Sequence, residues 1–172
     1  KVNSKKIKII PNAINKEFIQ KERKKKIKKN SLIIGMASRI NKLKRHDLII
    51  EALQHSDLRD YKIKCFFAGD GENLDYLKSL IKDKSKFKFF GKIKSNKLKK
   101  WYNYLDVYIQ ATNGEGHSTS ILQAMGMNLP IFASNVSGIK NFLIPKKKIG
   151  LTFENNKKYL INLIKIFIKM GE

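Results

Sequence analysis

The sequence predicts an α/β protein: a doubly wound, Rossmann-like parallel sheet of about six strands with helices on both faces. Three observations lead to this prediction. From Leu32 onward, apolar runs of strand length alternate with amphipathic stretches of helix length. The first of these runs, residues 32–37, is apolar throughout, as is typical of a strand that is covered on both faces. The chain has 172 residues, too few for the eight strand–helix units of a TIM barrel.

Residues 1–30 differ in composition from the rest of the chain and are predicted to be a linker with one opening strand. Residues 6–10 have the apolar character of a short strand, which the turn signal at Pro11 would close. Residues 16–30 are dominated by charge, which indicates a solvated linker or a surface helix. The domain itself is therefore placed at residues 31–172.

Within the domain, each predicted strand is followed by a helix or a helical turn, so the sheet is expected to be parallel with right-handed crossovers. The predicted strands are at 32–37, 62–68, 87–90, 106–110, 130–133 and 149–153. The predicted helices are at 45–55, 72–82, 95–105, 118–127 and 156–170, with a helical turn at 139–143. Ser95 is the expected N-cap of its helix. Cys65 is expected to be a small buried residue of a strand rather than a disulfide partner or zinc ligand.

Charge is the unusual feature of the composition. The formal net charge is +23, whereas the apolar fraction of 42% and the aromatic fraction of 10% are those of a folded domain. Such a field attracts polyanions. The cations are nearly all lysine, however, so compositional drift is the favoured explanation and a selected anionic partner is the alternative. No run approaches the length of a membrane span, and no signal peptide is present.

Loops that follow parallel strands carry the ligand sites of such sheets, and three of them have distinctive residues. Arg39 and Lys44 bracket the loop after the strand at 32–37, where a guanidinium and an ammonium could clamp a diphosphate. The alternative is two ordinary surface cations. Gly69 and Gly71 flank an acidic residue, which allows a sharp turn and a close approach to a neighbour.

A third loop is the most informative because it joins a carboxylate to a helix N-terminus. Glu115 precedes the helix that is expected to begin at Ser118. The amides of His117, Ser118 and Thr119 would form an anion site that the helix dipole assists. Glu115 and Gln123 could each bind sugar hydroxyls. The alternatives are an acid that complements the dipole and an exposed helix residue.

These loops, taken together, resemble the donor-binding half of the retaining GT-B glycosyltransferases of family 4. The third loop is similar to the E-x7-E signature region of that family. Further matches follow in family order. The matching residues are Ile10-Pro11-Asn12, Ser38-Arg39 with Lys44, Ile50-Glu51-Ala52-Leu53, Ala68-Gly69-Asp70-Gly71, Phe90-Gly91, Tyr102 with Asp106-Val107, Glu115-Gly116, Gln123-Ala124-Met125, Pro130-Ile131 and Ala133-Ser134.

The resemblance implies roles for most of these loop residues. Arg39 and Lys44 would neutralise the diphosphate of a nucleotide-sugar donor and so ease the departure of the leaving group. Glu115 would be the catalytic residue close to the donor sugar, and Lys92 and Ile93 would lie near the nucleobase.

The remaining implied donor-binding residues belong to the third loop and its helix. Gly116 and the amides of His117, Ser118 and Thr119 would contact the sugar and the phosphates. Gln123 would hold the ribose hydroxyls.

The sequence departs from the family pattern at several positions. Gln123 stands where the second glutamate of the signature is usual, which keeps an acceptor oxygen and loses the charge. Ala13 and Asn128 replace glycines, and His117 and Ser118 stand where Phe-Gly is common. We expect the last two to reshape the sugar pocket.

The function that the resemblance implies is transfer of a hexosyl unit from a nucleotide-diphosphate sugar to a glycan or lipid-linked acceptor, in bacterial surface polysaccharide or glycoconjugate synthesis. No metal or other cofactor is expected, and neither His46 nor His55 has ligand spacing to His117. The chain begins with Lys1 rather than Met, so we expect it to be part of a longer protein whose N-terminal domain binds the acceptor. The chain alone is then expected to be inactive.

Two other functions stay open at this level: a GT-B nucleotide-sugar epimerase, and a nucleic-acid-binding module driven by the positive charge. Against the second, the sequence has no helix-turn-helix pattern and no basic stripe with interleaved aromatics, so no nucleic acid is expected as a partner.

The expected location is cytoplasmic, with peripheral contact with the inner face of the membrane as an addition. The helix predicted at 156–170 carries a broad apolar stripe with lysines beside it. Packing on the sheet is the favoured use of this stripe, and an anionic membrane surface is the alternative.

Overall fold

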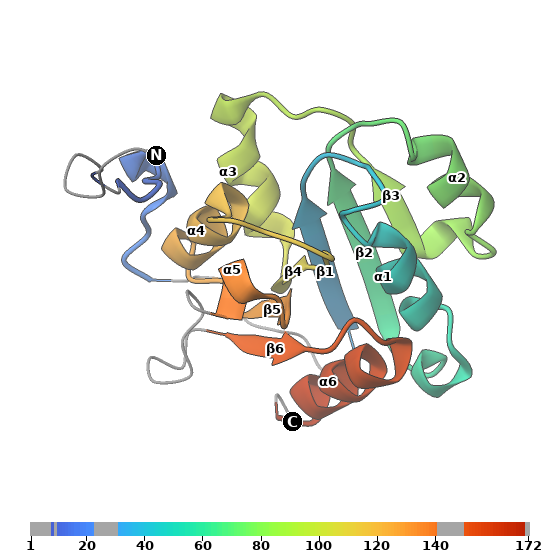
Figure 1. Cartoon of the computed structure of the whole chain (residues 1–172). Helices are drawn as coiled ribbons and strands as arrows, with labels where there is room; N and C mark the ends of the chain where they lie inside the picture. Colours follow the sequence, from blue (N-terminus) through green and yellow to red (C-terminus); the bar gives the residue numbers. More distant parts are fainter. Residues whose placement is uncertain (1–7, 9, 23–30, 141–149, 171–172) are drawn as a thin grey trace.

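The computed structural model describes residues 8, 10–22, 31–140 and 150–170 and consists of a parallel sheet between two helical layers (Figure 1). The six strands of the sheet pair in the order β3-β2-β1-β4-β5-β6, all parallel. Their bounds are Ser31–Ala37 (β1), Lys62–Ala68 (β2), Phe87–Phe89 (β3), Val107–Gln110 (β4), Ile131–Ser134 (β5) and Leu151–Phe153 (β6). The prediction of a doubly wound, Rossmann-like sheet is confirmed, and this order is the one known from dinucleotide-binding domains.

The helices divide between the two faces of the sheet, as the crossovers of such a fold require. They are His46–Leu53 (α1), Leu74–Ser79 (α2), Ser95–Tyr104 (α3), Thr119–Gly126 (α4), Ser137–Lys140 (α5) and Lys157–Met170 (α6). Helices α1, α2 and α6 contribute to the hydrophobic cluster on one face, and α3, α4 and α5 contribute to the cluster on the other (Figure 1).

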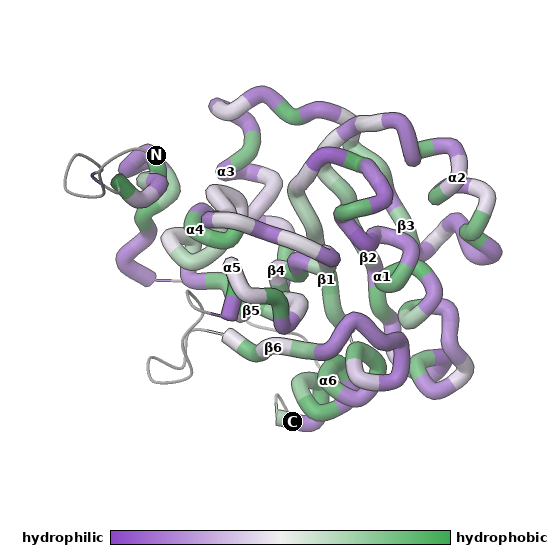
Figure 2. Tube along the Cα trace, viewed as in Figure 1, coloured by the Kyte–Doolittle hydropathy of each residue, from purple (hydrophilic) through white to green (hydrophobic). Residues whose placement is uncertain are grey.

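The alternation of side chains along the strands supplies both clusters. Leu32, Ile34 and Met36 of β1 belong to the cluster with α1 and α6, whereas Ile33 packs against the opposite cluster with Tyr108 of β4. Because successive strand residues point to opposite faces, a strand that is covered on both sides must be apolar at every position. In Figure 2 the central strands are mainly green and the connecting loops mainly purple. Cys65 of β2 is fully buried, as predicted.

Helix α6 packs on the sheet, as the favoured interpretation of its stripe requires. Its buried residues are Leu160, Ile161, Ile164 and Ile168. Tyr159, which the sequence places in the same stripe, is exposed, as are Ile166 and Met170. In the described part of the chain, no helix has the length and hydropathy needed to cross a membrane.

The described part of the segment that precedes the domain is mostly exposed, but one aromatic residue in it is buried. A short 3-10 helix, η2 (Lys16–Phe18), places Phe18 against the ring of Tyr102 with the ring centroids 6.0 Å apart. Phe18 is only 2% exposed, because an aromatic ring gains more from this contact than from solvent. Most of the strand predicted at 6–10 lies outside the described residues.

One capping prediction is wrong. Ser95 is the first residue of α3 rather than its N-cap, which is Lys94, and Lys94 makes no side-chain capping bond. The error is one position, and helix ends are the least certain feature of a sequence pattern.

The strand order reverses between β1 and β4, and this reversal opens a crevice at their carboxyl ends. The loops after β1 and β2 approach each other closely beside it. Gly69 has φ of 141°, and a side chain there would place its Cβ 1.8 Å from the carbonyl oxygen of Ser38. The glycine-flanked turn therefore makes the close approach that the sequence predicts.

Candidate functional site

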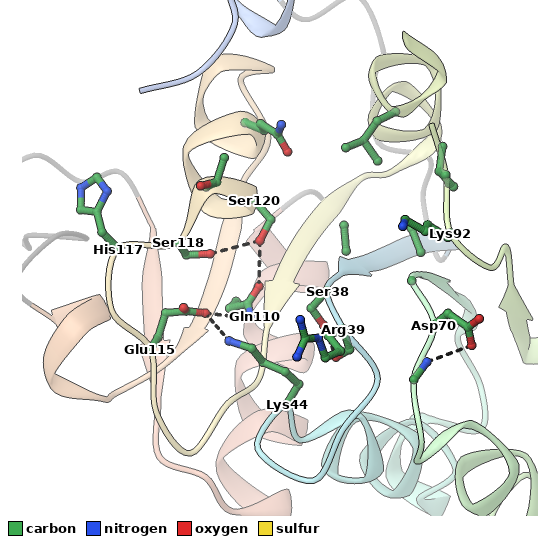
Figure 3. A pocket seen from close by; sticks show the side chains of 18 of the residues that line it. Ser38, Arg39, Lys44, Asp70, Lys92, Gln110, Glu115, His117, Ser118 and Ser120 are labelled. Atoms are coloured by element: carbon green, nitrogen blue, oxygen red, sulfur yellow. Dashed lines mark hydrogen bonds and ion pairs between the residues drawn. The ribbon is translucent and has the colours of Figure 1, made fainter. Parts of the chain in front are cut away.

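A cleft of about 1040 Å³ opens at the reversal of strand order (Figure 3). The loops after β1, β2, β3 and β4 line it, together with the start of α4. Nine of the ten predicted site residues are on its lining: Arg39, Lys44, Lys92, Ile93, Glu115, His117, Ser118, Thr119 and Gln123. Gly116 belongs to the same loop and is exposed, but it is not among the lining residues.

The centre of the cleft is an ion pair between two loops that are far apart in the sequence. The ammonium Nζ of Lys44, from the loop after β1, lies 2.6 Å from Oε2 of Glu115, from the loop after β4. The side chains are 15% and 16% exposed. Adjacent strands β1 and β4 bring these loops together, so the pair depends on the strand order.

Gln110, the last residue of β4, is a member of this site that the sequence analysis missed. It is fully buried, and its Nε2 donates to Oε2 of Glu115 at 3.4 Å. Its Oε1 lies 2.7 Å from the hydroxyl of Tyr108 and 3.4 Å from that of Ser120. Burial raises the pKa of Tyr108 well above its usual range, so its hydroxyl stays protonated. A polar side chain at the end of an otherwise apolar strand was the available signal.

The loop after β1 is closed by a buried histidine. His46 is the first residue of α1, and its Nδ1 contacts the carbonyl oxygen of Lys44. Its Nε2 lies 3.2 Å from the hydroxyl oxygen of Ser38. Burial lowers the pKa of His46 to about 4, so the ring is neutral at pH 7. A carbonyl only accepts, so Nδ1 carries the proton and Nε2 accepts from Ser38. His46 thus ties the two ends of the loop together.

Arg39 lies in the same loop and has a different environment. Its side chain is exposed on the cleft wall (Figure 3) and makes no ion pair within the described residues. The backbone beside it is held, because the amide of Ile40 donates to the carbonyl of Asp70 at 2.9 Å. Arg39 is therefore a solvated guanidinium on a fixed backbone, ready to bind an anion.

Helix α4 directs its N-terminus at the same cleft. Ser118 is the N-cap, and its hydroxyl accepts a hydrogen bond from the amide of Ile121 at 3.4 Å. The backbone carbonyl of His117 accepts a hydrogen bond from the side-chain amide Nδ2 of Asn12 at 2.7 Å, which fixes the backbone before the helix. The partial positive charge of a helix N-terminus attracts anions, so this end of α4 adds to the field of Arg39 and Lys44.

The loop that carries Glu115 rests on the start of α5. A Cβ at Gly138 would lie 1.8 Å from the carbonyl oxygen of Glu115 and 2.5 Å from that of Gly116. Only glycine allows this approach, so Gly138 fixes the height of the loop above the sheet.

Gln123 lies one helical turn further along α4, and it contacts a buried tyrosine. Its Oε1 is 3.1 Å from the hydroxyl of Tyr102, which is also 3.1 Å from the carbonyl of Ser120. Burial raises the pKa of Tyr102, so the tyrosine stays neutral. On the other side of the cleft, Lys92 is exposed and Ile93 half-buried.

Two departures from the family pattern have simple physical explanations. Asn128 has φ of 54°, the left-handed conformation that asparagine adopts more readily than other residues with a side chain, so it can replace glycine. Ala13 has no positive φ, so its backbone does not need glycine. The described residues contain no group of three or more His, Cys, Asp or Glu side chains arranged to hold a metal ion.

Comparison with known proteins finds a relative in sequence. Over 141 aligned residues the chain is 31% identical to protein CapJ of Staphylococcus aureus. The alignment covers 76% of this chain and 36% of CapJ. The chain thus spans little more than a third of that relative.

Two solved structures share the fold. The catalytic domain of cholesterol-alpha-glucosyltransferase from Helicobacter pylori superposes with a TM-score of 0.68 and 25% identity, over 80% of this chain and 86% of that one. Anabaena HepE in complex with UDP-glucose superposes with a TM-score of 0.70 and 20% identity, over 82% of this chain and 40% of that one.

The family assignment rests on the sequence as a whole. Residues 17–172, which include every strand and helix of the sheet domain, match the family described as glycosyl transferases group 1. The chain belongs to the group 1 glycosyl transferases.

Proposed function

We propose that the chain is the donor-binding half of a retaining GT-B glycosyltransferase of family 4, which binds a nucleotide-diphosphate sugar in the cleft. The observation that carries this proposal is the convergence of Arg39, Lys44, Glu115 and the N-terminus of α4 on one cleft. Two cations and a helix N-terminus suit a diphosphate, and a carboxylate beside them suits sugar hydroxyls. HepE, which shares the fold, binds UDP-glucose.

The reaction needs stabilisation of the leaving group. When the bond between the anomeric carbon and the diphosphate oxygen breaks, negative charge develops on the nucleoside diphosphate. Arg39, Lys44 and the first amides of α4 would stabilise that charge because they are already oriented towards the cleft. Glu115 would lie beside the sugar as the catalytic carboxylate. With this charge supplied by the protein, we propose that the reaction needs no metal ion, and we expect it to be insensitive to chelators.

The remaining predicted residues would recognise the nucleoside. Gln123 would contact the ribose, and Lys92 with Ile93 would flank the base at the side of the cleft formed by the loop after β3. The amides of His117 and Thr119 would contact the sugar and phosphates.

The whole protein's activity is a further part of the proposal. A hexosyl unit would pass to a glycan or lipid-linked acceptor in bacterial surface polysaccharide or glycoconjugate synthesis. An N-terminal domain of the longer protein would bind that acceptor and close the cleft. The chain spans 36% of CapJ, which leaves room for such a domain in a protein of that length.

We also propose that the protein works in the cytoplasm and touches the inner face of the membrane. Helix α6 supports this contact, since Tyr159, Ile166 and Met170 are exposed and Lys158 and Lys169 are exposed beside them. An exposed apolar line with flanking lysines suits an anionic lipid surface. Sedimentation with anionic vesicles and not with neutral ones is the expected result. Equal recovery with both kinds would contradict this contact.

Donor binding is tested by thermal-shift titration of the chain with UDP, GDP, ADP and their sugar derivatives. A ligand that binds the folded state raises the unfolding midpoint once its concentration exceeds Kd. We expect one nucleoside diphosphate series to raise the midpoint with a concentration dependence that saturates. Absence of any shift across the panel at millimolar concentration would contradict donor binding.

A further inference from the structure

The side chain of Gln110 hydrogen-bonds to polar side chains at the cleft, which a residue that only fills the core would not do. It is fully buried at the end of β4, at the base of the cleft, and its amide contacts Tyr108 as well as Ser120 and Glu115, the last two of which Figure 3 shows. A hydrophobic residue would fill this place without the cost of burying an amide. The amide is therefore expected to do something that packing alone does not require.

The partners of the amide determine its orientation. The neutral hydroxyl of Tyr108 lies 2.7 Å from Oε1 and 3.2 Å from the carbonyl oxygen of Ala37, and the hydroxyl of Ser120 lies 3.4 Å from Oε1. Nε2 then faces Oε2 of Glu115 at 3.4 Å. A rotated amide would place two acceptor oxygens opposite each other at that distance. Only the first orientation satisfies all three partners.

The consequence falls on the Glu115 carboxylate. The ammonium of Lys44 and the amide of Gln110 both donate to the same oxygen, Oε2. The other oxygen, Oε1, makes no hydrogen bond within the described part of the chain, and Glu115 lines the cleft. One oxygen is held by the protein, and the other is left for a ligand.

We propose that Gln110 is a positioning residue: it holds Oε2 of Glu115 together with Lys44, so that Oε1 is offered to a hydroxyl of the bound sugar. In the orientation that gives Glu115 a donor, Nε2 of the amide faces Glu115 and Oε1 faces the hydroxyls of Tyr108 and Ser120. The identity of the ligand rests on the proposed function, whereas the hold on Glu115 does not. The two parts are therefore tested separately.

The hold on Glu115 is tested without ligand, by the thermal midpoints of Gln110→Glu, Glu115→Gln and the double variant at pH 8. The first places two carboxylates 3.4 Å apart and should lower the midpoint. The double variant exchanges donor and acceptor, so it should melt about 3 °C or more above Gln110→Glu. A double variant that melts no higher than Gln110→Glu would overturn the proposal.

The effect on the ligand is tested with Gln110→Leu, using the affinity for UDP-glucose and for UDP. We expect Kd for UDP-glucose to rise about tenfold and Kd for UDP to change less than twofold, because only the sugar meets Glu115. Gln54→Leu is the matched control: it removes a half-buried amide that bonds Leu80 and Lys82, far from the cleft. Equal weakening of both ligands, or of neither, would overturn the positioning role.

If the unsubstituted chain binds neither UDP nor UDP-glucose, the proposed donor is wrong for these nucleotides. The ligand-free thermal cycle then still decides whether Gln110 holds Glu115. The two failures are thus distinguishable.

Discussion

The two walls of the cleft are built in different ways. One, the β1–β4 wall, consists of Lys44, Gln110, Glu115 and Ser120, whose side chains bond one another and are at least half-buried. The other, the β2–β3 wall, is formed by residues that follow those two strands. It includes Asp70, Lys92 and Ile93. There the hydrogen bonds come from backbone amides: that of Gly69 donates to the carbonyl of Gly91 at 2.8 Å, and that of Gly71 donates to the carboxylate of Asp70 at 2.9 Å.

The difference indicates a division of labour. Side chains held by neighbours keep their positions when a ligand binds, so the β1–β4 wall can align a reacting sugar and its diphosphate at little entropic cost. The β2–β3 wall offers backbone atoms and exposed side chains such as Asp70 and Lys92, which tolerate variation in the group they meet. We therefore expect substitutions on the first wall to matter more than those on the second.

The largest effect should come from acid, through the histidine that closes the loop of the first wall. Burial lowers the pKa of His46 from 6.5 to about 4, so between these pH values the histidine is protonated in the unfolded chain and neutral in the folded one. The contribution of His46 to the free energy of unfolding is fully present above pH 6.5. It decreases by about 3 kcal/mol as the pH falls from 6.5 to 4. Urea unfolding of wild type and His46→Gln between pH 7 and 4 measures it.

His55→Gln is the control for this experiment, because His55 is a partly exposed histidine of the same chain. The slope of stability with pH should shrink in His46→Gln and persist in His55→Gln. Equal slopes in all three proteins would show that His46 is not a buried neutral residue.

Lys44→Ala should weaken nucleoside diphosphate binding about thirtyfold, the largest loss among the cation substitutions. It removes an ammonium and leaves the Glu115 carboxylate unpaired next to the diphosphate. Isothermal titration gives the Kd. Lys42→Ala is the matched control, since Lys42 is exposed in the same loop and is not on the lining of this cleft. A similar loss in both variants would contradict a local role for Lys44.

Arg39→Ala should weaken the same ligand about tenfold, because it removes a cation and leaves no partner unpaired. In the full-length enzyme that we propose, the same change should lower kcat/KM by about the same factor. Arg59→Ala, at an exposed position beyond η3 (Ser56–Leu58), is the control for loss of charge. Unchanged kinetics in Arg39→Ala would contradict the diphosphate role.

Lys92→Ala on the β2–β3 wall should change Kd less than threefold, since an exposed lysine in water contributes little to binding. Its effect should vanish at high salt, whereas that of Lys44→Ala should persist in part. A loss as large as that of Lys44→Ala would remove the distinction between the two walls.

Much of the fold could be predicted from the sequence, because apolar runs and helical periodicity are local signals. The cleft lining could be predicted as well, since Arg39, Lys44 and Glu115 follow strands whose carboxyl ends meet at one edge. The pairing of Lys44 with Glu115 could not, because it depends on β1 and β4 being neighbours.

The buried polar residues were missed for a related reason. Gln110 and His46 have the apolar surroundings of a strand end and a helix start, and their partners come from distant parts of the chain. Phe18 was obscured by the lysines around it. In each case a tertiary contact outweighed the local pattern.

The claim that this cleft recognises a diphosphate is tested most directly by titrating the chain with UDP and UMP, and with the corresponding guanine and adenine pairs. The two members of each pair differ only in the phosphate that Arg39, Lys44 and α4 would meet. We expect the preferred diphosphate to bind at least about tenfold more tightly than its monophosphate, with the advantage lost in Lys44→Ala. Equal affinity for the two would contradict a diphosphate site.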